Sequence, residues 1–300
     1  MAPDRLKVGL VVLNWNGAAV LPLCLETLET AAAVSRHDVG LLLVDNDSRD
    51  GSDLWAEREH PAWELLRTGS NLRYAKGMNA GIRAWLDRGA DYILLLNNDI
   101  RADAEFIDPL IEDLETGTPR GAACPRIHYM GLPQQIWYGG GRVSRYFRIT
   151  AHRGIRKHAL GSLRESGVTD YLTGCALMGK AAFWKETGGF DKNFEFYAED
   201  VDLSLRAREA GWSLRYVPSS LIYHRVGHSS GGGLSESKLR AQWKGTRKLI
   251  GRHVHPALRP MAWLAWALHV GITALKASLR GERGLSASMA RALSKKGKSP

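Results

Sequence analysis

An apolar run that ends in two amides and a carboxylate is the first chemical feature of this sequence. Residues 92–99 read YILLLNND, so Asn97, Asn98 and Asp99 close a strand-like segment. A carboxylate in this position suits a hard divalent cation such as Mg2+ or Mn2+, which prefers oxygen ligands. One carboxylate holds such an ion weakly, so substrate phosphates would have to complete its coordination. The alternative is that Asp99 caps the turn, a common role for Asp and Asn.

Three acids within four positions form the second feature. Glu199, Asp200 and Asp202 lie in the stretch YAEDVDLSLRAREAGW (197–212), which has helical spacing. Acids in a first helical turn can cap the helix and favour its dipole, so a purely structural role is available. Three acids are nevertheless more than a cap requires. A carboxylate fixed at a helix start beside a cavity can take a proton from a hydroxyl nucleophile.

A histidine after an apolar run is the third feature. His224 ends the segment VPSSLIYH, and a single histidine at a strand end is more often structural than catalytic. Imidazole is also a competent ligand for Mn2+. Its role therefore depends on whether the fold brings it close to Asp99.

The elements that must position these residues follow an alternating pattern in the first hundred residues. Strand-like segments occur at 7–15, 39–47, 63–69 and 92–99, and helix-like segments separate them at 18–32, 52–60 and 76–89. Alternation of this kind predicts an α/β domain with a mostly parallel sheet and helices on both faces. Trp85 has the spacing of a core residue in the third of these helices.

Polar side chains follow three of the predicted strands. In a parallel sheet, ligands bind beyond the carboxyl ends of the strands. Neither G-x-G-x-x-G nor G-x-x-x-x-G-K-[ST] occurs, which disfavours a Rossmann dinucleotide site and a P-loop. The polar residues expected at this edge are Asn14, Trp15, Asn16, Asp45, Asn46, Asp47, Asn97, Asn98 and Asp99.

The positive charge of the chain is concentrated in its last segment. The net charge is +10, yet 14 of the 41 Lys and Arg residues lie in 238–300 with one acid, and the rest of the chain has 27 basic and 30 acidic residues. A nucleic-acid groove in the first 237 residues is therefore not expected. The apolar stretch at 260–275 is short for a membrane span. It predicts an interfacial helix attracted to anionic lipid, or a helix that packs on the main domain.

The cysteines bear on the compartment. Cys24, Cys124 and Cys175 are far apart and odd in number, which suggests neither a disulfide framework nor a zinc site. A reducing, cytoplasmic location is expected, and the N-terminus does not have the layout of a secretory signal.

An ordered set of motifs makes the chain resemble the inverting glycosyltransferases of family 2, which have the GT-A fold with its Rossmann-like sheet. The resemblance covers about residues 7–228 and is strongest to bacterial rhamnosyltransferase-like enzymes of cell-surface polysaccharide biosynthesis. It implies a GT-A catalytic domain at 1–237, with a nucleotide-binding half at about 1–100 and an acceptor half at about 101–237, followed by a basic, partly amphipathic helical tail at 238–300. The motifs are VVLNWNG, LLLVDNDSRDGS, NLRYAKGMNAGI, YILLLNND, YLTGCALMGKAAFWKETGGFDKNFEFYAEDVDLSLRAREAGW and VPSSLIYH.

The resemblance also implies roles for individual residues. Asp45 would recognise the nucleotide base, Trp15 would stack on it, and Asn14 and Asn46 would line the same pocket. Asp99 would bind the metal that bridges the donor diphosphate, with Asn97 and Asn98 orienting the donor. Asp200 matches the general base of the family, and His224 matches a histidine that completes the metal site in some members.

Two departures from the family pattern affect this assignment. Asn97 and Asn98 replace acids found in many relatives, so the ion is expected to bind weakly until the diphosphate arrives. Many members have Ala-Arg-Asn where this chain has Gly-Met-Asn ending at Asn79, so Lys76 or Arg73 is expected to supply the positive charge for the donor.

The implied reaction moves a sugar, with rhamnose the candidate, from a nucleoside diphosphate to a hydroxyl of a glycan or a polyprenyl-diphosphate-linked acceptor. Glu199, Trp137 and Tyr138 are the candidates for acceptor or sugar contact. The implied location is peripheral, at the inner face of the cell membrane. Two other classes stay open from the residues alone: a nucleotidyltransferase acting on sugar phosphates, and a non-catalytic protein that binds glycan or nucleic acid.

Overall fold

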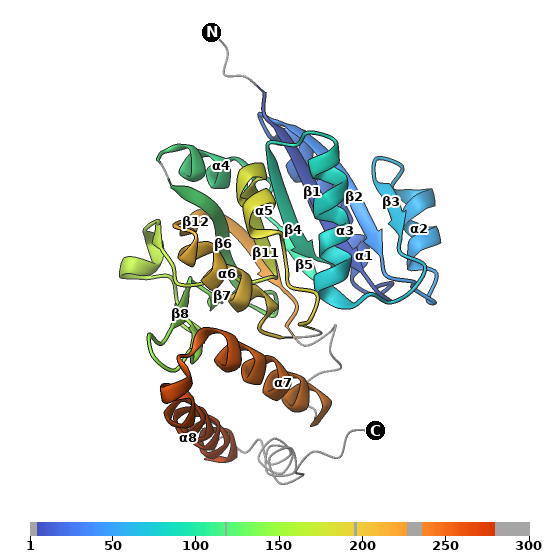
Figure 1. Ribbon diagram of the computed structural model, residues 1–300. Coiled ribbons are helices and arrows are strands. Elements are labelled where there is room, and N and C mark those ends of the chain that lie inside the picture. The colour runs from blue at the N-terminus through green and yellow to red at the C-terminus, as the bar shows by residue number, and fades with distance from the viewer. Residues whose placement is uncertain (1–4, 118, 195–196, 227–235, 280–300) are drawn as a thin grey trace.

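The computed structural model describes residues 5–117, 119–194, 197–226 and 236–279 (Figure 1). Its centre is one large mixed sheet with helices on both faces, followed by two helices from the tail. The predicted α/β fold with a mostly parallel sheet is confirmed.

The first half of the chain builds parallel strands joined by helices. The apolar segments pair because strands buried on both faces read as continuous runs of Val, Ile and Leu. The strands of this half are β1 (Lys7–Asn14), β2 (Asp38–Asp45), β3 (Glu64–Arg67) and β4 (Tyr92–Asn97). The connecting helices are α1 (Leu21–Val34), α2 (Ser52–Glu59) and α3 (Arg73–Asp87).

The second half extends the same sheet. The order across it is β10-β12-β6-β11-β4-β1-β2-β3, with β5 beside β12 and β7 beside β6, while β8 and β9 form a separate pair. Only β11 interrupts the central parallel arrangement, since it is antiparallel to both β4 and β6. The strands are β5 (Ile100–Ala102), β6 (Arg120–Tyr129), β7 (Leu132–Tyr138), β8 (Gly141–Val143), β9 (Thr150–His152), β10 (Gly167–Val168), β11 (Ala176–Lys180) and β12 (Ser213–His224). The helices are α4 (Asp108–Glu115), η1 (Gly161–Arg164), α5 (Ala181–Thr187) and α6 (Glu199–Glu209).

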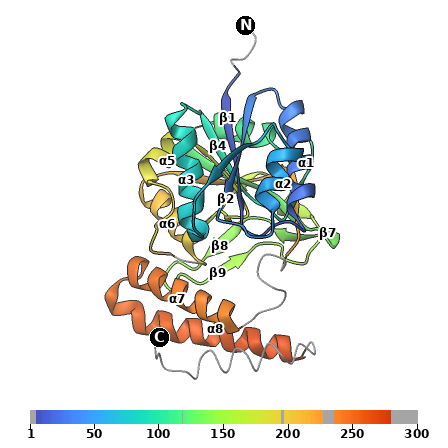
Figure 2. The same cartoon turned by 90° about the vertical axis from the view of Figure 1, so that its right-hand side faces the viewer.

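Helices cover both faces of the sheet. Figure 2 shows α1 and α2 on one side and α3, α5 and α6 on the other. Helix α3 packs closely because Gly9 and Gly40 leave room for the indole of Trp85, which a Cβ on either glycine would overlap. Trp85 is buried, as its spacing predicts.

The tail forms two more helices, α7 (Glu236–His253) and α8 (Arg259–Leu279), with a short turn, η2 (Pro256–Leu258), between them. Both views place them beyond the edge at which the parallel strands end, with α7 nearer the sheet and α8 outside it (Figures 1 and 2). Ile250, Val254 and Ala262 form a small core of their own between the two helices. Within the described ranges, no helix is long and apolar enough to cross a membrane.

Candidate functional site

A cluster of buried polar side chains lies at the carboxyl ends of β1 and β2. Asn14 and Asp45 lie side by side in the strand register, and the Asn14 amide donates to Asp45 Oδ1 over 3.0 Å. Asn98, just after β4, donates to Asn14 Oδ1 over 2.8 Å. All three side chains are buried. Three residues that follow three different strands are therefore joined in one hydrogen-bonded chain.

Two serines complete this chain. Ser48 donates to Asp45 Oδ1 through its hydroxyl and to Oδ2 through its backbone N–H, at 2.6 and 2.9 Å. The hydroxyl of Ser52, at the start of α2, accepts from the Asn14 amide at 2.8 Å. Neither serine is among the predicted site residues, although both lie in the motif LLLVDNDSRDGS. The Asp, Asn, Ser and Gly residues of this motif are typical of a turn after a strand.

Trp15 and Asn46 follow the same two strand ends. The Trp15 side chain is 49% exposed. Asn46 is buried, and its amide donates to the Arg73 carbonyl at 3.1 Å while its oxygen accepts from Thr68 at 3.3 Å. Gly17 lies beside Asn14 and Asn98, and a Cβ there would overlap both side chains.

Asp99 and His224 meet at the ends of β4 and β12. His224 Nε2 lies 3.2 Å from Asp99 Oδ1, and both side chains are almost fully buried. The contact is fixed by the pairing of His224 with Ile100, the residue after Asp99, and by the hydrogen bond from the Arg225 N–H to the Asp99 carbonyl. The Trp137 ring packs edge-on against His224, with 4.6 Å between the ring centroids. Asp99 and His224 are more than 120 residues apart in the sequence, and the fold brings them together.

The protein supplies only some of the ligands that a divalent ion at the Asp99–His224 corner would need. A carboxylate and an imidazole together suit Mn2+. Among the described residues, no group of three or more His, Cys, Asp or Glu side chains is arranged to hold a metal. Two protein ligands leave most of a six-coordinate shell to water or phosphate oxygens. The residues present therefore fit an ion that is held jointly with a diphosphate.

Asp200 lies in the first turn of α6. The helix follows Tyr197 and Ala198, both of which have φ of +70°. Backbone in the left-handed region is strained for residues other than Gly, and such strain is concentrated at functional sites. The turn aims the Asp200 carboxylate at the segment before β11, where Oδ2 accepts from the Gly174 N–H at 3.0 Å. Oδ1 accepts from the Val201 N–H at 2.8 Å.

The surroundings of Asp200 favour proton acceptance. Removal from water raises the pKa of Asp200, against the hydrogen bonds from Gly174 and Val201 that lower it. Burial, and then the neighbouring Asp200 carboxylate, raises the pKa of Glu199 to about 8. The Tyr74 hydroxyl donates to the Gly174 carbonyl at 2.6 Å, and its pKa is raised well above the usual value by burial and by the two acids. Both carboxyl groups therefore hold a proton more readily than ordinary acids, and their closeness disfavours a charge on both at once.

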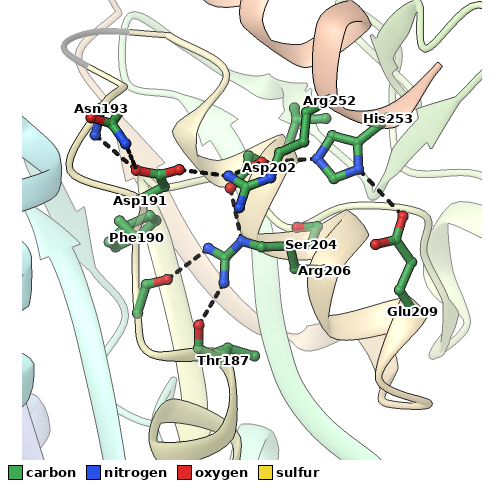
Figure 3. Close-up of polar contacts among 12 residues, drawn as sticks. Thr187, Phe190, Asp191, Asn193, Asp202, Ser204, Arg206, Glu209, Arg252 and His253 are labelled. Atoms are coloured by element: carbon green, nitrogen blue, oxygen red, sulfur yellow. Dashed lines mark hydrogen bonds and ion pairs between the residues drawn. The ribbon is translucent and has the colours of Figure 1, made fainter. Parts of the chain in front are cut away.

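The third acid of the cluster has a structural environment (Figure 3). Asp202 is completely buried and accepts from Arg206 at 2.9 Å and from Arg252 at 3.2 Å, while His253 Nε2 lies 2.8 Å from its carboxylate. Burial alone would raise the pKa of Asp202, but the hydrogen bonds from His253 and Arg206 hold it below its usual range. Arg252 also pairs with Asp191 at 2.5 Å. Since Arg252 and His253 belong to α7, this network joins the tail to the helix that carries Asp200.

The remaining predicted residues lie in varied places. Asn79 both donates to and accepts from the backbone of Phe190, at 2.7 and 2.9 Å, and so fastens α3 to the loop before α6. Tyr138 is completely buried, with its hydroxyl donating to the Tyr171 carbonyl at 2.6 Å. The backbone N–H of Asn97 donates to the Cys175 carbonyl. Lys76 is exposed on α3 and lines a hollow that is described below.

Comparison with known proteins gives consistent results. The sequence profile described as Glycosyl transferase family 2 matches residues 10–186. An N-acetylglucosaminyl-diphospho-decaprenol L-rhamnosyltransferase of Mycobacterium tuberculosis is 30% identical over 295 residues, which cover 89% of this chain and 91% of the relative. The rhamnosyltransferase WbbL of Escherichia coli is 30% identical over 108 residues, which cover 35% of this chain and 40% of that protein.

Solved glycosyltransferases share the fold. The mannosyltransferase PcManGT from Pyrobaculum calidifontis, in complex with GDP-Man and Mn2+, superposes with a TM-score of 0.56 at 17% identity and covers 98% of this chain and 82% of its own. GalNAc-T7 with UDP, GalNAc and Mn2+ superposes with a TM-score of 0.61 at 15% identity and covers 82% of this chain and 48% of its own. The expected GT-A architecture is confirmed by these neighbours.

Proposed function

Because the chain belongs to glycosyl transferase family 2, we propose that it transfers rhamnose, with inversion, from a nucleoside diphosphate to a hydroxyl of a polyprenyl-diphosphate-linked glycan. The rhamnosyltransferase of Mycobacterium tuberculosis supports both the sugar and the acceptor class, since its name specifies L-rhamnose and an N-acetylglucosaminyl-diphospho-decaprenol. Membership of a glycosyltransferase family also decides against the nucleotidyltransferase and the non-catalytic binding protein.

The position of the Asp200 carboxylate is the observation that carries the mechanism. Two backbone N–H groups, of Gly174 and Val201, hold one oxygen each, so the carboxylate is fixed in direction. A fixed carboxylate with a raised pKa is suited to take the proton of an attacking hydroxyl. In this proposal Asp200 deprotonates the acceptor hydroxyl, which attacks the anomeric carbon from the face opposite the leaving diphosphate. The bond from the anomeric carbon to the diphosphate oxygen breaks as the new glycosidic bond forms.

Glu199 has a different role in the proposal. With a pKa raised to about 8, it is protonated at neutral pH and can donate a hydrogen bond to a sugar hydroxyl. Trp137 packs against His224, beside the proposed metal site, and is the aromatic residue that we propose to contact the sugar.

The donor would be held at two places. Asp45, Asn14, Asn46 and Trp15 lie together at the ends of β1 and β2 and are proposed to bind the nucleoside. Asp99 and His224 are proposed to hold Mn2+ or Mg2+, with Asn97 and Asn98 orienting the donor beside it. When bound, the ion stabilises negative charge on the leaving diphosphate as a Lewis acid.

The outer helix of the tail supports a membrane partner. Along α8, Met261, Leu264, Leu268, Ile272 and Leu275 recur every three or four residues, and each is more than half exposed. A stripe with this spacing lies on one face of a helix. The helix contains no Asp or Glu, so no carboxylate on it repels anionic lipid. We therefore propose that α8 lies in the surface of the inner leaflet, which would place the enzyme peripherally on the cytoplasmic side, next to its lipid-linked acceptor.

Donor identity is tested by thermal stabilisation. The chain is heated with Mn2+ and each of dTDP-rhamnose, UDP-sugars and GDP-sugars, and the ligand that raises the Tm most is then assayed for transfer to a GlcNAc-diphospho-polyprenol. We expect dTDP-rhamnose to stabilise the chain and to yield a rhamnosylated lipid. Stabilisation by another sugar nucleotide, with no transfer of rhamnose, would refute the choice of donor.

Membrane binding is tested by sedimentation with vesicles of phosphatidylglycerol and phosphatidylethanolamine. Deletion of the whole tail would also remove Arg252 and His253 from buried Asp202, so the better variant is Leu264→Gln/Leu268→Gln. We expect this variant to remain in the supernatant while the wild type pellets. Pelleting of both to the same extent counts against the proposal.

A further inference from the structure

A second site for a diphosphate lies beside the acid cluster. A hollow of about 240 Å³ opens between the N-terminal end of α3, the loop at 192–194 and helix α7. Four cations from these three segments line it, together with Leu72, Asn193 and Phe194; the cations are Arg73, Lys76, Lys192 and Lys248. Among the residues that the structure describes, no carboxylate lines the hollow.

The charges in the hollow are not neutralised within the part of the chain that the structure describes. No ion pair joins Arg73, Lys76, Lys192 or Lys248 to a described carboxylate. The Lys248 ammonium donates to the Asn193 carbonyl and lies 5.8 Å from the centre of the Phe194 ring. Neither contact neutralises the positive charge of Lys248, so its ammonium group can still attract an anion. Four like charges around one small hollow repel one another, and an anion of two or more charges would relieve that repulsion.

Two chains of contacts connect the hollow to Asp200. On one side, Tyr74 lies between Arg73 and Lys76 on α3, and its hydroxyl donates to the carbonyl of Gly174, whose N–H donates to Asp200. On the other side, Lys248 lies one turn along α7 from Gly245, which packs against the backbone of Tyr197, three residues before Asp200. The elements that line the hollow are therefore linked to Asp200 through Tyr74 and Gly174 and through the contact of α7 with Tyr197.

The hollow is separate from the corner proposed for the donor diphosphate. None of its lining residues is Asp99, His224 or Trp137. Arg73 and Lys76, which the family resemblance assigns to the donor, do line it, so the inference gives these two cations to the acceptor instead. The proposed reaction involves two diphosphates, one on the donor and one on the lipid. The Asp99–His224 corner suits a diphosphate held with a metal, and the hollow suits a diphosphate held directly by ammonium and guanidinium groups.

We propose that this hollow binds the diphosphate of the lipid-linked acceptor, with the polyprenyl chain leaving past α7 toward α8. This inference rests on the proposed function, because it takes the acceptor to be a lipid diphosphate. Helix α7 lies between the sheet and α8 in both views, so a bound diphosphate is near the surface that carries the apolar stripe (Figures 1 and 2). The assignment gives α7 a direct part in acceptor binding.

The test uses farnesyl diphosphate as the probe, by titration calorimetry in EDTA. Removal of divalent ions prevents a diphosphate from being held through a metal at Asp99, so the remaining binding reports on the hollow. The variant is Lys192→Gln/Lys248→Gln. These are the two cations of the hollow that are not on α3 and that have no proposed role in donor binding. We expect its affinity for farnesyl diphosphate to fall about tenfold, as for the loss of two charge-assisted hydrogen bonds at an open site.

The matched control is Lys185→Gln/Arg247→Gln. It removes two exposed cations, one from α5 just before the same loop and one from α7 beside Lys248, and neither lines the hollow. Its affinity should equal that of the wild type. Farnesol, which lacks phosphates, should bind all three proteins alike. Equal affinity of both double variants for farnesyl diphosphate, or no binding to the wild type in EDTA, overturns the inference.

A second measurement separates the lipid diphosphate from the donor diphosphate. In transfer assays with a GlcNAc-diphospho-polyprenol, the Lys192→Gln/Lys248→Gln variant should raise the acceptor KM about tenfold and leave the donor KM unchanged. A rise in the donor KM alone assigns the hollow to the donor and refutes the inference. If no transfer occurs with any donor, the proposed function fails, and the calorimetric result still decides whether the hollow binds a lipid diphosphate.

Discussion

Gly245 of α7 lies directly against the main chain of Tyr197, so that a Cβ on Gly245 would overlap the Tyr197 carbonyl oxygen. Tyr197 and Ala198 form the left-handed turn that leads into α6 and Asp200. The tail helix therefore supports the strained backbone from which the proposed general base projects. Helix α7 belongs to the basic tail, yet it packs against the turn that leads to Asp200.

Replacement of Gly245 by Ala should disturb this contact. The backbone of Tyr197 has no room to accept a methyl group, so either α7 or the turn must shift, at a cost of about 1–3 kcal/mol. We expect a lower Tm and a lower kcat. Gly251→Ala is the control on the same helix, because a Cβ there meets nothing within 4 Å, and it should stabilise the protein by about 0.5–1 kcal/mol. Similar effects of the two substitutions would contradict the contact.

Asp202→Asn should separate the tail from the main domain. The substitution leaves Arg206, Arg252 and His253 around a buried neutral group, and loss of one partner in a buried ionic network costs about 3–5 kcal/mol. Denaturant unfolding measures this loss. Glu59→Gln, which breaks an exposed pair with Arg58, should leave the midpoint unchanged. A midpoint for Asp202→Asn equal to that of the wild type would show that the network does not hold α7 in place.

Asp200→Asn should abolish transfer and preserve donor binding. The amide keeps the shape of the carboxylate but cannot take a proton at neutral pH, so kcat should fall by about 100-fold or more. Donor affinity, measured by calorimetry with Mn2+, should stay within about twofold, because the donor is proposed to bind at Asp45 and Asp99. A variant that retains most of its rate would exclude Asp200 as the base.

Asp99→Ala should weaken the metal-dependent part of donor binding. Asp99 and His224 are the carboxylate and imidazole proposed to hold the ion, so loss of Asp99 leaves one protein ligand for it. Nucleotide titrations with Mn2+ should then resemble titrations in EDTA. His37→Ala serves as the control, because His37 comes just before β2 begins, at the opposite end of that strand from Asp45. A difference between Mn2+ and EDTA that survives in Asp99→Ala would refute the metal assignment.

Glu199→Gln should change how stability depends on pH. The pKa of Glu199 is about 8 in the folded state, against 4.5 for the ordinary side chain. Between these values the unfolded chain loses the proton and the folded protein keeps it, so the free energy of unfolding of the wild type falls as the pH rises through this window. The variant has no such titration. Its Tm advantage should therefore grow from about pH 4.5 to about pH 8 and then level off.

The control for this prediction is Glu105→Gln, since Glu105 is exposed and its removal should add no pH-dependent difference. Transfer by Glu199→Gln should persist near neutral pH, because Gln resembles the protonated acid. A Tm difference that does not vary with pH would show that Glu199 ionises normally in the folded protein.

Much of the fold could be predicted from local pattern. The alternation of apolar runs and amphipathic segments places β1 to β4 and α1 to α3 close to their observed bounds, because burial on both faces of a parallel strand leaves a continuous apolar run. Trp85 is an example, since its helical spacing with Met78 and Ile82 indicates a buried face, and all three are buried. The insertion of antiparallel β11 between β4 and β6 has no comparable signal, because strand order depends on long-range pairing.

The residue types at the site, and their places after strands and at a helix start, are determined by the sequence itself. Asn14, Asp45 and Asp99 follow apolar runs whose ends must meet at one edge of a parallel sheet, so their proximity follows from period and chain direction. Asp99, just before β5, and His224, at the end of β12, are far apart in the chain, and the β5–β12 pairing brings them to 3.2 Å. The tertiary structure also decided that Asp202 holds the tail while Asp200 faces Gly174, because one helical turn points neighbouring acids in different directions. Composition shows a basic tail, and only packing shows that its first helix lies against the turn before Asp200.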